Sequence, residues 1–123
     1  MRFTGKELAA IFRVGHAMAD ADGKVTEDET NYIVSELASF GVTQDQFEAI
    51  IDAGGDLTGT QAMDIISNMD EEQKTYVSAY LGMIMASDGD IDDTELALWR
   101  FICTPCDCPD MTLGEAIELL GGD

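Results

Sequence analysis

The stretch Met85-Ala86-Ser87-Asp88-Gly89-Asp90-Ile91-Asp92-Asp93-Thr94-Glu95 decides the fold, because it joins the end of one apolar helix to the start of another through an acidic turn. The same pattern occurs once before, as Ala19-Asp20-Ala21-Asp22-Gly23-Lys24-Val25-Thr26-Glu27-Asp28-Glu29. Two copies of one helix, turn and helix unit predict an internal repeat. We therefore expect the rest of the chain to pack these two turns near each other.

Residues inside each turn have a mechanical reason for their positions. Gly23 and Gly89 suit the left-handed backbone at which a helix stops. Glu29 and Glu95 each lie three residues after a Thr or Asp that can cap the next helix, so each can complete a capping box. Both turns therefore predict the end of one helix and the start of the next.

The carboxylates of the two turns form a candidate site for a hard divalent cation, calcium or magnesium. A helix C-terminus adds partial negative charge to side chains that already repel one another, and a cation would relieve this repulsion. The candidate ligands are Asp20, Asp22, Glu29, Asp88, Asp90 and Glu95. The alternative is that these side chains only cap helices and turns in water. We expect both turns on one surface, since the two helices that precede them are equivalent and can pack together.

Capping pairs along the whole chain predict an all-α fold. Seven times a Thr or Asp is followed three residues later by Glu or Gln, and apolar residues at helical spacing follow each pair. The pairs are Thr4/Glu7, Thr26/Glu29, Thr43/Gln46, Thr58/Gln61, Asp70/Gln73, Asp92/Glu95 and Thr112/Glu115. Residues 1–123 are thus predicted to form a single compact domain of about seven helices without strands.

Apolar residues surround the segments 71–86 and 93–103, so these are the expected central helices, with Trp99 buried between them and their neighbours. Gly15 is expected to allow a close helix crossing. Gly54-Gly55 is expected to end the third helix.

The composition limits the partners of this chain. It has 25 Asp and Glu against 6 Lys and Arg, a net charge of −19, which repels nucleic acid and anionic membranes. A basic protein surface or a cation is the partner that such a charge favours, although acidic residues also simply keep small proteins soluble. No apolar signal-peptide core or span for membrane insertion is present, so a cytoplasmic protein is expected.

Three cysteines in one loop form a possible thiol site. Cys103, Cys106 and Cys108 lie within six residues, a spacing close to that of a zinc site, but the only histidine, His16, is remote in sequence. Zinc is therefore not expected. Small buried thiols or one disulfide at the end of the sixth helix explain the same residues.

The repeated acidic turns and the number of helices resemble the TerB-like family of tellurite-resistance proteins. The motif is Ala-x-x-Asp-Gly-x-[Val/Ile]-x-x-x-Glu, which places Asp22, Gly23 and Glu29, with their equivalents in the second copy, on the family pattern. The resemblance implies a seven-helix domain of bacterial stress-response and tellurite-resistance systems, with proposed divalent-metal binding. The second copy has Ala86 where the first has Asp20, so the two turns are not identical as ion sites.

Two functions follow as hypotheses. The first is a TerB-like, non-catalytic protein-interaction module that binds a divalent cation in its acidic turns. The second is a metal-independent acidic module that docks a basic protein partner. No phosphate-binding glycine loop, di-iron pattern or candidate triad is present, so we do not expect an enzyme.

Overall fold

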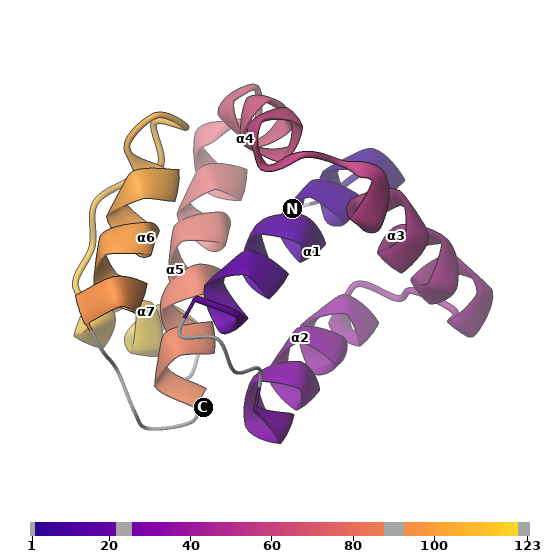
Figure 1. Ribbon diagram of the computed structural model, residues 1–123, viewed down its shortest axis with the longest axis horizontal. Helices are drawn as coiled ribbons and strands as arrows, with labels where there is room; N and C mark the ends of the chain where they lie inside the picture. The colour runs from indigo at the N-terminus through magenta and orange to yellow at the C-terminus, as the bar shows by residue number, and fades with distance from the viewer. Residues whose placement is uncertain (1, 22–25, 88–92, 121–123) are drawn as a thin grey trace.

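The computed structural model describes residues 2–21, 26–87 and 93–120, and in these residues the regular secondary structure is entirely helical. The helices are α1 (Gly5–Ala19), α2 (Glu27–Ser39), α3 (Gln44–Asp56), α4 (Gly59–Ser67), α5 (Glu71–Ser87), α6 (Asp93–Cys103) and α7 (Leu113–Leu120). The prediction of an all-α fold with seven helices is confirmed (Figure 1).

Reciprocal capping starts most of these helices, as predicted. At α1, for example, Thr4 Oγ1 accepts from Glu7 N at 3.1 Å, and Glu7 Oε1 accepts from Thr4 N at 2.8 Å. Reciprocal bonds of this kind also form at the starts of α2, α3, α4, α5 and α7. The pair Asp92/Glu95 involves a residue outside the described part of the chain.

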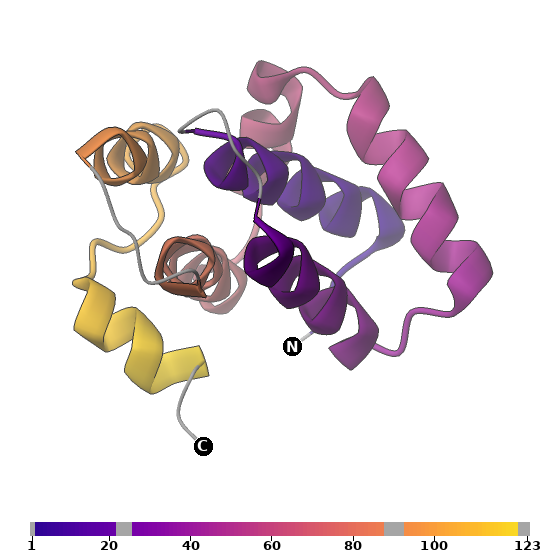
Figure 2. The same cartoon turned by 60° about the horizontal axis from the view of Figure 1, so that its bottom comes forward.

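Helices α1 and α5 form the centre of the molecule. Helix α1 contacts α2, α3, α4, α5 and α6, and α5 contacts α1, α2, α6 and α7, as Figures 1 and 2 show from two directions. The prediction that α5 and α6 are the central pair is therefore wrong for α6. Helix α6 packs on the outer side of α5, and its Phe101 is 65% exposed. Trp99 is buried as predicted, and its Nε1 donates to the Ser78 carbonyl at 3.0 Å.

Glycines let the helices approach closely. A Cβ atom at Gly15 would lie 2.9 Å from the ring of Tyr80 on α5, which confirms the predicted close crossing. Gly54 was expected to end α3, but the helix continues to Asp56. The reason is packing, because a Cβ at Gly54 would lie 2.8 Å from the ring of Phe12 on α1.

Three tyrosines fill the space between α2 and α5. The Tyr76 and Tyr80 rings stack with centroids 5.8 Å apart, and the Tyr32 ring lies 5.9 Å from that of Tyr80. Tyr76 Oη donates to Glu36 Oε1 at 2.7 Å. The hydroxyls of Tyr32 and Tyr80 are buried and have no hydrogen-bond partner among the described residues. The hydroxyl of Tyr76 is therefore expected to contribute to stability, whereas those of Tyr32 and Tyr80 are not.

Tyr76→Phe and Tyr80→Phe should change stability in different directions. Tyr76→Phe removes a hydrogen bond to a carboxylate and should lower the free energy of unfolding by about 1.5 kcal/mol. Tyr80→Phe removes a buried hydroxyl that has no hydrogen-bond partner among the described residues, and it should leave the free energy of unfolding unchanged or raise it by up to about 1 kcal/mol. Urea denaturation measures both. Equal losses in the two variants would contradict this description of the tyrosine cluster.

Candidate functional site

The two repeat-equivalent glutamates are buried beside the acidic turns. Glu29 in the first turn of α2 and Glu95 in the first turn of α6 are each 1% exposed. Glu29 Oε1 accepts from Thr26 N at 2.9 Å and from Thr26 Oγ1 at 3.1 Å, so the capping box offsets part of the cost of burial. Capping thus holds the Glu29 carboxylate at the start of α2, and Glu95 is buried at the equivalent position of α6.

The other predicted cation ligands are divided between described and undescribed residues. Asp20 is the exposed C-cap of α1, and its N–H donates to the His16 carbonyl at 2.9 Å. Asp22, Asp88 and Asp90 lie outside the described residues, as do Gly23 and Gly89. The expected packing of α1 against α5 is confirmed. The predicted proximity of the two turns themselves concerns residues that are not described.

No cluster of metal ligands is found in the part of the chain that the structure describes. Within residues 2–21, 26–87 and 93–120, no group of three or more His, Cys, Asp or Glu side chains is arranged to hold a metal ion. This applies to the cysteine loop, whose three thiols are described in full.

The end of α6 is a complete Schellman motif that brings two cysteines together. The Cys108 N–H donates to the Cys103 carbonyl at 3.0 Å, and the Asp107 N–H donates to the Thr104 carbonyl at 3.2 Å. Asp107 has φ +59°, the left-handed position usually taken by glycine in this motif. The first and last residues of such a motif commonly contact each other through their side chains. Here those residues are Cys103 and Cys108.

The cysteines are free thiols, and all three are buried. A hydrogen bond from the Cys108 thiol to the Cys103 sulfur lowers the pKa of Cys103, against the opposing effect of burial, and raises the pKa of Cys108. Burial raises the pKa of Cys106 to about 11, and its Sγ donates to the Met63 carbonyl at 3.3 Å. The thiols therefore divide into Cys103 and Cys108, which influence each other's pKa, and the separate, protonated thiol of Cys106.

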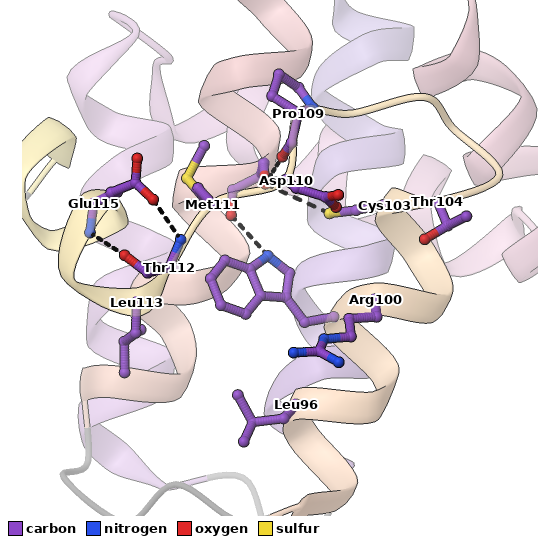
Figure 3. Close-up of a pocket in the computed structure, with 12 residues that line it drawn as sticks. Leu96, Arg100, Cys103, Thr104, Pro109, Asp110, Met111, Thr112, Leu113 and Glu115 are labelled. Carbon is purple, nitrogen blue, oxygen red and sulfur yellow. Dashed lines mark hydrogen bonds between the residues drawn. The ribbon is translucent and has the colours of Figure 1, made fainter.

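Cys103 faces a cavity of about 660 Å³ between α5, α6 and α7. Leu96, Arg100 and Cys103 approach it from α6, and Leu113 approaches it from the α7 side (Figure 3). Its size is within the range of small-molecule sites in proteins. Cys106 instead lines a second cavity, of about 520 Å³, next to exposed Phe101. Neither cavity could be predicted from sequence, because each depends on how α6 packs.

An acidic stripe runs along the outside of α3. It consists of Asp45, Glu48, Asp52 and Asp56, which are all exposed. They are separated by three, four and four positions, so they share one face of the helix. Helix α3 contains no Lys or Arg. This spacing is visible in the sequence, but the four residues lie outside the repeated turns from which the candidate ligands were predicted.

A comparison with known protein families identifies the family of this chain. The sequence model of the family described as tellurite resistance protein TerB matches residues 7–106 of this chain. This range covers both acidic turns and all helices from α2 to α6. This chain belongs to the TerB family. The resemblance expected from the repeated motif is therefore confirmed.

A structural comparison supports the same TerB fold. The crystal structure of a protein of unknown function from Porphyromonas gingivalis W83 is similar to this chain with a TM-score of 0.86 and 47% identity, over 98% of this chain and 92% of that one. No curated protein matches this TerB-family chain. In the described residues, no helix is both long and apolar enough to cross a membrane.

The Schellman motif at the end of α6 predicts an effect on stability. Asp107→Gly should raise the free energy of unfolding by up to about 1 kcal/mol, because glycine adopts positive φ without a Cβ penalty. Asp110→Gly, in the same loop but without positive φ, is the control and should lower the free energy of unfolding by about 0.5 kcal/mol through a more flexible unfolded chain. Urea denaturation measures both, and destabilisation by Asp107→Gly would contradict the motif.

Proposed function

We propose that this TerB-family domain is a non-catalytic, cytoplasmic interaction module that docks a basic protein surface within a stress-response or tellurite-resistance system. The observation that carries the proposal is the acidic stripe of α3, formed by Asp45, Glu48, Asp52 and Asp56. Four carboxylates on one helical face without an intervening basic residue give a continuous negative surface. The net charge of −19 adds a long-range attraction for basic partners.

The position of the stripe suits docking. Helix α3 packs on α1 on one side, where Gly54 allows close contact, and its opposite side is open to solvent (Figure 1). A partner can therefore reach the stripe without disturbing the core. Electrostatic complementarity of this kind governs the association rate and the choice of partner more than the final affinity, and it weakens as salt rises.

Neutralising the stripe should abolish docking without unfolding the domain. The test variant combines Asp45→Asn, Glu48→Gln, Asp52→Asn and Asp56→Asn. The matched control combines Asp64→Asn, Asp70→Asn, Glu71→Gln and Glu118→Gln, which are also exposed and remove the same charge from positions outside α3. Partners captured from native cells by the parent at physiological salt should bind the control within about twofold, and the test variant at least about tenfold more weakly.

Equal loss of binding in the control and test variants would show that only net charge matters, and would count against a defined docking face. Partners that bind the α3 variant as tightly as the parent would place the interaction elsewhere. Circular dichroism of each variant checks that its helix content is unchanged.

A second candidate function is binding of calcium or magnesium at the acidic turns. Burial of Glu29 and Glu95 at equivalent places favours it, because two carboxylates are held within the helix junctions that adjoin the turns. The proposed ligands are these two residues together with Asp20, Asp22, Asp88 and Asp90. Such a cation would stabilise the domain and shape the surface that a partner meets.

Calorimetric titration of chelator-treated protein with calcium, and separately with magnesium, tests the second candidate. We expect a saturable heat with a dissociation constant on the order of a millimolar, the weak end of calcium modules. Asp22→Ala and Asp88→Ala should each weaken binding, whereas Asp64→Ala on α4 should not. The site is refuted if the parent gives no saturable heat, or if all three variants retain the parent's affinity.

A further inference from the structure

We propose that Cys103 and Cys108 form a redox-active dithiol that exchanges with low-molecular-weight disulfides entering the cavity between α5, α6 and α7. This modification site is separate from the docking face on α3. It rests on three features of the described residues: a backbone return that brings the two cysteines together, a cavity lined by Cys103 and not by Cys108, and a neighbouring thiol that bonds elsewhere.

The backbone brings the two cysteines together. The Schellman motif returns the chain so that the Cys108 N–H donates to the Cys103 carbonyl at 3.0 Å. The left-handed residue Asp107 makes this return possible. A disulfide requires two cysteines that are close in space, and the backbone return of this motif brings Cys103 and Cys108 together.

The cavity distinguishes the roles of the two buried thiols. Cys103 lines the 660 Å³ cavity, whereas Cys108 is not among the residues that line it. Apolar side chains of Leu96, Trp99 and Met111 also face this space, so a small uncharged disulfide can enter it. Cys103 is therefore the thiol that reacts first with the incoming disulfide. Cys108 is the thiol that then attacks the mixed disulfide formed on Cys103.

The chemistry proceeds in two balanced exchanges. In the first, Cys103 loses its proton and its sulfur attacks one sulfur of the reagent RSSR. The S–S bond of the reagent breaks, a mixed disulfide forms on Cys103, and the RS⁻ that leaves takes up a proton. In the second, deprotonated Cys108 attacks Cys103 Sγ, and the second RS⁻ leaves and is protonated. The protein dithiol is oxidised to one disulfide, and one RSSR is reduced to two RSH.

Polar groups around Cys103 support its role as the attacking thiol. The Cys103 thiol donates to Ser78 Oγ at 3.6 Å, and Ser78 Oγ donates to the Pro109 carbonyl at 2.9 Å (Figure 3). A hydroxyl at this place can turn to donate to a thiolate. The lowered pKa of Cys103 and the raised pKa of Cys106, about 11, agree with this assignment, because the thiolate is the reactive species.

The test treats the reduced full chain with hydroxyethyl disulfide and follows it by intact mass spectrometry and peptide mapping. The parent should lose two hydrogen atoms and yield a peptide that links Cys103 to Cys108. Cys108→Ser should stop at one hydroxyethylthio group on Cys103. Cys106→Ser is the matched control and should react at the parent's rate within about twofold, whereas Cys103→Ser should react at least about tenfold more slowly.

Other results would overturn the proposal. They are a parent disulfide that includes Cys106, a Cys103→Ser variant as reactive as the parent, or a folded parent that stays unmodified under conditions in which the urea-unfolded chain reacts. Peptide mapping of the parent does not depend on the folding of any variant. Cys108→Ala, compared with Cys108→Ser by circular dichroism, shows whether the trapped intermediate comes from a folded protein.

Discussion

The packing of α1 against α5 is the constraint on which the rest of the structure depends. Gly15 allows it, because no side chain larger than hydrogen fits between the α1 backbone and the ring of Tyr80. Helices α3 and α4 then pack against α1, α7 packs against α5, and α2 and α6 each contact both central helices. The two halves of the repeat thus meet through their first helices, and the second helices, α2 and α6, take positions on opposite sides of that pair (Figure 2).

This arrangement separates the chemical surfaces of the domain. Carboxylates dominate the outer face of α3, on the α1 side, while the thiols lie beneath α6 on the α5 side. Buried Glu29 and Glu95 lie in the first turn of α2 and of α6, which are the second helices of the two repeat units. Each residue is therefore next to the acidic turn of its own unit. An acidic docking face and a thiol pair can therefore act independently, because the central helices lie between them.

The loop after α6 shows how a backbone motif creates a chemical site. A helix that ended at Cys103 with an ordinary exit would carry its following cysteines away into solvent. The Schellman return instead buries Cys106 and Cys108 and directs them to different neighbours. Asp107 adopts a left-handed conformation that side chains disfavour, so the return persists because the burial and hydrogen bonding of the adjacent cysteines stabilise it.

The sequence by itself determined the helices and the family, because capping pairs, helical periodicity and the repeated turn are local patterns whose meaning does not depend on distant residues. It also marked Trp99 as buried and Gly15 as a crossing point. Only the tertiary structure decided that α1 is central, that Gly54 lies in a helix contact within α3, and that Cys103 and Cys106 line two different cavities. These depend on which faces of distant helices meet, and apolar periodicity shows that a face is buried without showing against what.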